Sequence, residues 1–297
     1  MLVIKTIVHE TVWGGNRLAK YCDSNSKNIG HLYSLISNDT FESEILNGKY
    51  KGQIFKKYFD ENKERLNLGQ YKNFPFLIAL VDATDDLSLQ VHPNDEVAKE
   101  LENLDFGKNE SFYFLESPKT NKMFMGCKAK DLKELQEKIA LKKYNEIFGY
   151  LPVKIGDYVY IEAGTVHALS AGSLVYEIEE NCDATYRIYD FDRVDKNGKK
   201  REIHLQSALK SVCLDKKSTP KRYSGEIKER FYSTRLFENE VNHTNTSKTI
   251  ECLTFLSEEA KINEFLIKKG TTVVLEPNES INFSKSNFIV AKPRIKV

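Results

Sequence analysis

The chain has 297 residues, of which 40% are apolar, and 44 basic residues nearly balance 43 acidic ones to give a net charge of +1 at pH 7. This length accommodates one large β domain or two smaller ones, and the apolar share is sufficient for a sizeable core. A near-neutral charge gives no reason to expect nucleic acid or an acidic membrane as a partner.

The cysteines and the N-terminus bear on the compartment. Five cysteines are scattered along the chain, an odd number that indicates reduced thiols rather than a disulfide framework. The first residues show no apolar run with a cleavage site, and no stretch of 18 apolar residues occurs. We therefore expect a soluble, cytoplasmic protein without a membrane anchor.

The first predicted elements are a helix and two strands. Residues 49–67 carry apolar side chains at helical spacing, and 76–81 is an apolar run typical of a buried strand. Residues 87–92 alternate apolar and polar, which is the period of a half-buried strand, so Gln90 and His92 project on the same side. At ~3.3 Å per residue the two side chains start about 7 Å apart, near enough to reach one metal ion. Taken alone, the pair also fits a polar, surface-facing strand.

Two further candidate ligands follow on strand-like segments. Glu110 opens an apolar run at 111–115, and His167 comes just after another run at 157–161. Two imidazoles, one carboxylate and one amide oxygen suit Zn²⁺ or a similar divalent ion. Three protein ligands with a position left open are typical of a catalytic zinc site, whereas closed structural sites are usually rich in cysteine.

Helices are predicted on either side of Glu110. Residues 93–101 follow the first candidate ligands, with Asn94 or Asp95 as a plausible N-cap. Asp131-Leu-Lys-Glu134 is a capping-box pattern, and its apolar face continues to about residue 141. We expect this second helix to lie outside the β barrel, as a helical insertion near 130–148.

The C-terminal part has the pattern of a second β domain. Residues 211–230 are polar and rich in lysine, which is typical of a linker. The expected division is a metal-binding catalytic domain over 1–215 and a smaller β domain over 216–297. The latter contains only His243 as an imidazole, so no metal is expected there. Its predicted strands are 232–237, 249–255, 264–267, 272–275 and 287–291.

Several motifs, taken together, resemble the type I mannose-6-phosphate isomerases in their short bacterial form. These are zinc-dependent enzymes with the cupin fold. The resemblance starts at Val12-Trp-Gly-Gly15 and extends to Arg201-Glu-Ile-His204, so it covers roughly the first 205 residues in the right order. The motifs that carry it are Asp82–Asp95, Gly107-Lys108-x-Glu110, Ala163-Gly-Thr-Val-His-Ala168 and Asn181–Asp190.

The resemblance implies a fold, a metal and a reaction. The fold would be mainly β, a cupin jelly-roll barrel with small helical insertions and a degenerate second cupin at the C-terminus. One Zn²⁺ per chain would be held by Gln90, His92, Glu110 and His167. The implied activity is the interconversion of mannose 6-phosphate and fructose 6-phosphate by proton transfer through an enediol or enediolate, a step of carbohydrate metabolism.

Three further residues are candidates for catalysis or substrate binding. Arg187 resembles the family's catalytic arginine, and its forked, permanently charged side chain suits an oxyanion or a phosphate. Glu177 is the carboxylate best placed to act as base, and Lys108 is a candidate anion contact. A structural reading stays open for two of them, because Glu177 lies in an acidic run typical of a solvated strand edge and Arg187 could pair with Asp190.

The chain departs from the family pattern at five positions, and Glu179 and Glu180 stand where the family usually has glutamine. If those two carboxylates face the pocket, they would repel a phosphate. Two alternatives therefore stay open: a cupin isomerase for another sugar phosphate, or a non-catalytic cupin that binds a sugar phosphate. In each case the expected partner is a small-molecule sugar phosphate, and the protein is expected to be a monomer or homodimer. The five departures are His31, Tyr33, Glu162, Glu179 and Glu180.

Overall fold

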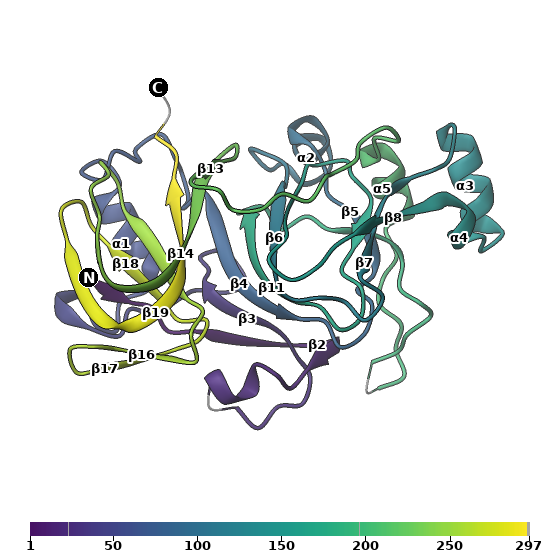
Figure 1. The fold of residues 1–297 in the computed structure, drawn as a ribbon. Coiled ribbons are helices and arrows are strands. Elements are labelled where there is room, and N and C mark those ends of the chain that lie inside the picture. The colour runs from purple at the N-terminus through teal and green to yellow at the C-terminus, as the bar shows by residue number, and fades with distance from the viewer. Residues whose placement is uncertain (23, 196, 296–297) are drawn as a thin grey trace. The chain divides into compact units, whose positions relative to one another are not determined.

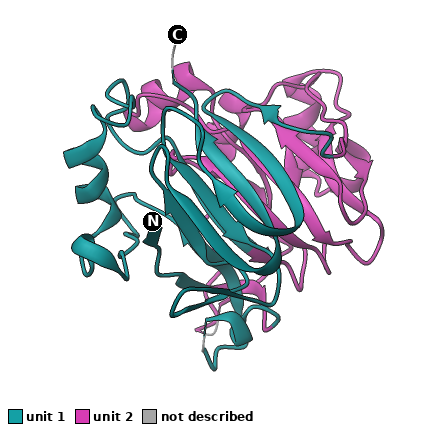
Figure 2. Ribbon diagram, turned by 60° about the vertical axis from the view of Figure 1, so that its left-hand side comes forward, with its two compact units in different colours: residues 1–9, 17–80, 223–297 teal, residues 10–16, 81–222 magenta. Residues whose placement is uncertain are grey.

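The computed structural model describes residues 1–22, 24–195 and 197–295, and strands predominate over helices, as the sequence predicts. The chain forms two compact units, coloured separately in Figure 2. Unit 1 consists of residues 1–9, 17–80 and 223–297, and unit 2 of residues 10–16 and 81–222. The chain passes between them within β2 (Ile7–Gly15) and again within β4 (Phe76–Asp82). Within the described part of the chain, no helix has the length and apolar character needed to cross a membrane.

This division differs from the expected boundary at residue 215. The last passage from unit 2 to unit 1 lies after residue 222, inside the predicted linker, but unit 1 also contains most of the first 80 residues. The first strand, β1 (Leu2–Val3), pairs antiparallel with β18 (Thr272–Leu275), which ties the N-terminus to the C-terminal strands. A pairing over such a sequence distance leaves no trace in local periodicity.

Unit 1 contains a six-stranded sheet in the order β1-β18-β15-β19-β14-β13, beside the hairpin β16-β17. One face of the sheet buries an apolar cluster that includes Leu253, Phe255, Phe288 and Val290. The remaining elements of unit 1 are β3 (Ile29–Leu35), α1 (Phe55–Asn62), β13 (Ile227–Lys228), β14 (Tyr232–Thr244), β15 (Glu251–Phe255), β16 (Glu259–Ile262), β17 (Phe265–Lys268) and β19 (Ser280–Pro293).

Unit 2 contains the five-stranded sheet β12-β5-β10-β7-β8 and the strands β11-β6-β9, which are one end of a six-stranded sheet. Its strands are β5 (Leu89–Val91), β6 (Glu110–Glu116), β7 (Lys122–Cys127), β8 (Phe148–Pro152), β9 (Tyr158–Ile161), β10 (His167–Ala168), β11 (Leu174–Glu180) and β12 (Tyr186–Tyr189). Its helices are α2 (Asp95–Glu102), α3 (Leu132–Ala140), α4 (Tyr144–Ile147) and α5 (Leu205–Ser211). Figure 1 shows α3 and α4 beyond β8, away from the other strands of this unit.

The helix starts follow the predicted caps. The Asn94 side chain accepts a hydrogen bond from the Val97 amide at 2.9 Å, so Asn94 rather than Asp95 caps α2. Asp131 caps α3 by accepting from the Glu134 amide at 2.7 Å. The predicted helix at 49–67 is shorter than expected, since α1 begins only at Phe55. Residues 48–50 form a 3-10 turn instead, and Gly52 has a φ of +82°, which interrupts a helix.

Candidate metal centre

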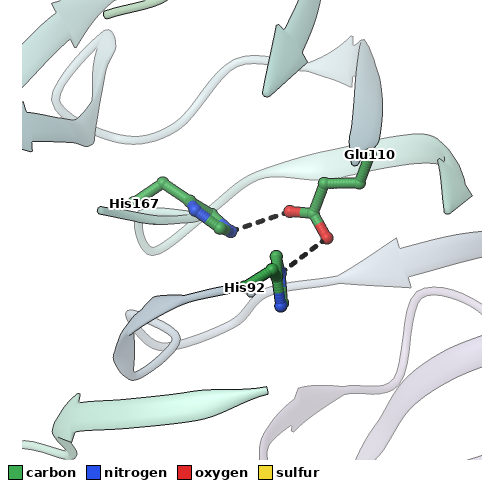
Figure 3. A group of neighbouring side chains, drawn as sticks. All are labelled: His92, Glu110 and His167. Carbon is green, nitrogen blue, oxygen red and sulfur yellow. Dashed lines mark ion pairs between the residues drawn. The ribbon is translucent and has the colours of Figure 1, made fainter. Parts of the chain in front are cut away.

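His92, Glu110 and His167 come together in the interior of unit 2 (Figure 3). The Nε2 atom of His92 lies 3.0 Å from Glu110 Oε2, and the Nε2 atom of His167 lies 2.8 Å from Glu110 Oε1. The three side chains are at most 2% exposed. The sequence placed these residues on three separate segments, and the fold brings them to one point.

The hydrogen bonds of the two imidazoles identify which nitrogen is available to a ligand. The Nδ1 atom of His92 lies 3.0 Å from the Ala184 carbonyl oxygen, and that of His167 lies 2.9 Å from the Thr165 carbonyl oxygen. A carbonyl oxygen only accepts, so each Nδ1 carries the proton and each Nε2 of a neutral ring presents a lone pair. Burial lowers the pKa of His92 to about 4, and the positive charge of Lys108 acts in the same direction.

Both Nε2 lone pairs therefore point at a carboxylate, with which they make no hydrogen bond. Lone pairs facing carboxylate oxygens repel one another unless a cation lies among them. Donor atoms of two imidazoles and one carboxylate, all within 4.8 Å of one another, fit a divalent metal ion. The backbone carbonyls that hold the Nδ1 protons are the kind of partner that orients histidine ligands of metals.

Strand register places Gln90 and Arg187 beside this group. Gln90 on β5 lies opposite His167 on β10 and, on its other side, opposite Arg187 on β12. Residues directly opposite in antiparallel strands project to the same face of the sheet, and His92, two residues beyond Gln90, shares that face. The Gln90 side-chain oxygen accepts a hydrogen bond from Ser88 Oγ at 3.2 Å.

A glycine allows the segments of two ligands to approach. A Cβ atom on Gly107 would lie 2.2 Å from the Pro93 carbonyl oxygen and 2.5 Å from the Asn94 carbonyl carbon, so only glycine fits here. The Lys108 amide donates to the same Pro93 oxygen at 3.0 Å. The segment before Glu110 is thereby fastened to the segment just after His92.

Lys108 is surrounded by carboxylates. Its Nζ atom lies 2.6 Å from Glu179 Oε2 and 3.7 Å from Glu110 Oε2, and its side chain is 7% exposed. Burial disfavours the charge on Lys108, but the carboxylates of Glu179 and Glu110 outweigh it and raise the pKa of this lysine. Glu179 lies opposite Glu110 in the β11–β6 register, which explains why both reach the same ammonium group.

Glu177 belongs to the same face of β11. Carboxylate oxygens of Glu110, Glu177 and Glu179 lie within 4.8 Å of one another. Burial, followed by the negative charges of Glu179 and Glu110, raises the pKa of Glu177 well above its usual range. The side chain is not on a solvated strand edge, because the residue is only 4% exposed.

Arg187 is not held by Asp190. The Asp190 carboxylate instead pairs with Arg193 and with Arg201, whose Nε donates to it at 2.8 Å. No ion pair to Arg187 occurs among the described residues. Its backbone is fixed by His204, whose Nδ1 accepts from the Arg187 amide at 3.2 Å. The structural alternative for Arg187, an ion pair with Asp190, is therefore wrong.

Asn109 and Glu180 connect two metal-site segments, and the sequence analysis missed the role of both. The Glu180 carboxylate, fully buried, accepts hydrogen bonds from the Asn109 amide at 3.2 Å and from Asn109 Nδ2 at 2.9 Å. Asn109 Oδ1 in turn accepts from the Ala163 amide at 2.7 Å, on the loop that leads to His167. Glu180 thus holds Asn109, the residue next to Glu110. Asn109 in turn ties this segment to the loop that leads to His167.

The other departures from the family pattern lie elsewhere. Glu162 is exposed and forms an ion pair with Lys216 at 3.0 Å. His31 and Tyr33 belong to unit 1, where their rings stack on each other at 5.3 Å. Of the five departures, Glu179 is the one whose carboxylate belongs to the group that includes Glu110.

Comparisons with known proteins point to one family. Residues 1–119 match the family model described as phosphomannose isomerase type I, catalytic domain. The chain is 32% identical over 255 residues to the mannose-6-phosphate isomerase ManA of Bacillus subtilis, covering 86% of this chain and 77% of that protein. It is 34% identical over 217 residues to the mannose-6-phosphate isomerase of Streptococcus mutans, covering 72% of this chain and 68% of that protein.

Solved structures extend the likeness to the whole chain. The crystal structure of the mannose 6-phosphate isomerase from Bacillus subtilis superposes with a TM-score of 0.86 at 25% identity, covering 98% of both chains. A putative mannosephosphate isomerase from Archaeoglobus fulgidus gives a TM-score of 0.81 at 17% identity, which supports the fold alone. The expected cupin fold is confirmed. The chain belongs to the type I mannose-6-phosphate isomerase family.

Proposed function

We propose that this protein interconverts mannose 6-phosphate and fructose 6-phosphate with one Zn²⁺ bound by Gln90, His92, Glu110 and His167. The observation that carries the proposal is the buried pair of imidazole lone pairs directed at the Glu110 carboxylate. Two nitrogen donors and one carboxylate are a common donor set of catalytic zinc sites. The bound ion would supply a Lewis acid that polarises the sugar carbonyl.

Glu177 is proposed to move the proton. Converting an aldose to a ketose removes a proton from C2 and delivers one to C1, and one group can both accept and release it. A carboxyl group whose pKa is raised binds a proton more readily and is suited to both roles. Glu177 lies two residues from Glu179 on the same face of β11, so its carboxyl group is directed to the side on which Glu110 lies.

Arg187 and Lys108 are proposed to bind the negative charges of the substrate. The Arg187 guanidinium has no carboxylate partner among the described residues, and its fork geometry suits two phosphate or sugar oxygens. Lys108 keeps its charge in the interior because Glu179 and Glu110 face it. It is therefore a charged donor next to the metal site.

The test is a coupled assay for fructose 6-phosphate formed from mannose 6-phosphate, on metal-stripped protein with and without added Zn²⁺. We expect turnover only with metal, and its loss in His92→Ala and in Arg187→Ala. Retained zinc binding in Arg187→Ala, measured by chelator competition, would separate substrate binding from metal binding. Turnover that survives complete removal of metal would contradict the proposal.

A second candidate is isomerisation of another sugar phosphate. The observation that favours it is the ion pair between Glu179 and Lys108, because a family position usually occupied by glutamine here binds a lysine of the site. A panel of aldose phosphates with metal-loaded protein decides between the two. Binding without turnover of any substrate in the panel would favour a non-catalytic cupin.

A further inference from the structure

The core face of the sheet in unit 1 changes from apolar to charged at one end. Across β14, β19 and β15, one row of the register is Phe237, Phe288 and Phe255, and the next is Arg235, Val290 and Leu253. One step further in the same direction, the same face carries Ser233, Lys292 and Glu251, two residues beyond the previous row on each strand. At this end Ser233 and Glu251 are buried whereas Arg235 is exposed, so the charged residues lie where the core face meets solvent.

This end of the sheet surrounds a cavity of about 250 Å³. At ~30 Å³ per water molecule it has room for roughly eight waters, enough for a small metabolite but not for a peptide. The lining includes Ser233, Arg235, Phe237, His243, Glu251 and Lys292.

The two carboxylates of the cavity already have basic partners. Glu251 Oε2 lies 2.7 Å from His243 Nε2, and both side chains are about nine-tenths buried at 10% and 11% exposure. Glu226 Oε1 binds Lys292 Nζ at 3.0 Å and accepts from Ser233 Oγ at 2.9 Å. These contacts fix the acidic groups as acceptors in defined positions.

Arg235 differs from the other charged groups. It forms no ion pair among the described residues, and its guanidinium lies over the Phe237 ring, 4.8 Å from the ring centroid. Stacking on an aromatic ring holds the planar guanidinium while its N–H groups remain available to an anion. The cavity therefore offers the Arg235 guanidinium to an anion. Its hydroxyl, imidazole and carboxylate groups can form hydrogen bonds with the hydroxyl groups of a polyol.

We propose that this cavity is a second binding site, separate from the metal centre, for a small anionic polyol of the sugar-phosphate class. Arg235 binds the phosphate, and Glu251 and His243 bind hydroxyl groups. A purely structural role explains the arrangement less well, because extending the apolar cluster would avoid the desolvation cost of partly buried ion pairs.

The test follows the imidazole NMR signal of His243 in full-length, metal-loaded protein, with the signal assigned by its loss in His243→Gln. Inorganic phosphate and glucose 6-phosphate are the probes. We expect a saturable shift with both, at lower concentrations for glucose 6-phosphate. Arg235→Gln should weaken both by about tenfold or more, as expected for a lost charged hydrogen bond. The control Lys285→Gln, an exposed lysine on β19 outside the cavity, should leave both unchanged.

The proposed site is overturned if the His243 signal does not shift when either probe is added. It is also overturned if the signal shifts at the same probe concentrations in Arg235→Gln as in wild type. Equal affinity for the two probes overturns its assignment to sugar phosphates. Isomerase turnover is measured in a separate assay, and Arg235 has no part in the proposed reaction. These outcomes therefore do not bear on the proposed function of the metal centre.

Discussion

Glu177 is a buried carboxyl group among charged neighbours, and its replacement isolates proton transfer from binding. Glu177→Gln keeps the size of the side chain and removes its ability to exchange a proton. We expect kcat to fall by about 10²–10⁴-fold, the usual contribution of a general acid or base. Zinc affinity, measured by chelator competition, should stay within a few-fold of wild type. A variant with nearly full turnover would show that another group moves the proton.

Glu179 sets the charge next to the metal site. Glu179→Gln removes a negative charge 2.6 Å from Lys108, so the pocket becomes more attractive to a doubly charged phosphate. We expect KM for mannose 6-phosphate to fall several-fold, and the Tm to fall as well because a buried ion pair is broken. The matched control is Glu146→Gln, a half-exposed carboxylate on α4. An unchanged or higher KM in Glu179→Gln would show that Lys108 is not oriented toward the substrate.

At the scale of elements, the loop that leads to His167 is fixed by residues outside the ligand set. The Ala163 amide donates to Asn109, and the Gly164 amide donates to the His92 carbonyl oxygen at 2.9 Å. Asn109→Ala removes the first of these contacts and also removes the Nδ2 donor of the buried Glu180 carboxylate, which keeps the backbone amide of residue 109. We expect zinc affinity to fall about 10–100-fold, as for other groups that orient metal ligands. The comparison is Asn145→Ala, an exposed position on α4. Equal zinc affinities in the two variants would contradict this role.

The sequence predicts well what depends on local pattern. The caps of α2 and α3 are present as expected, and β5 shows the predicted alternation over Leu89–Val91, a shorter stretch than the predicted 87–92, because each depends on neighbours a few residues away. The part played by Glu180 was missed because its partner Asn109 lies 71 residues away and no spacing rule connects them. For the same reason the sequence leaves open which way Glu179 faces, whereas the fold supplies Lys108 as its partner.

Unit 1 contains an ion pair whose contribution to stability depends on pH. Both terminal nitrogens of Arg65 donate to the Glu276 carboxylate at 2.8 Å, and the Tyr58 hydroxyl donates to it as well. The hydrogen bonds from Arg65 lower the pKa of Glu276. A depressed folded pKa adds stability above the unfolded value near 4.3, and this is lost as the pH falls through the folded value.

Glu276→Gln is therefore expected to lower the free energy of unfolding at pH 7 by about 1 kcal/mol or less, because the pair is partly exposed. The difference from wild type should shrink as the pH falls from about 5 to below 4. Thermal melts of both proteins between pH 7 and pH 3 measure it. A difference that stays constant across this range would mean that the charge of Glu276 contributes nothing.

For the whole molecule, the metal is expected to act as a stabilising ligand of the folded state. The imidazole and carboxylate donors of unit 2 converge only after β5, β6 and β10 have assembled, so the unfolded chain offers no preformed site. At a free metal concentration 100 times Kd, binding adds about 2.7 kcal/mol to the free energy of unfolding.

A chelator should therefore lower the wild-type Tm by several degrees. It should have almost no effect on His92→Ala, which lacks a ligand, whereas Asn145→Ala should respond like wild type. Equal shifts in wild type and His92→Ala would mean that the chelator acts elsewhere, and that the buried imidazoles do not hold the ion.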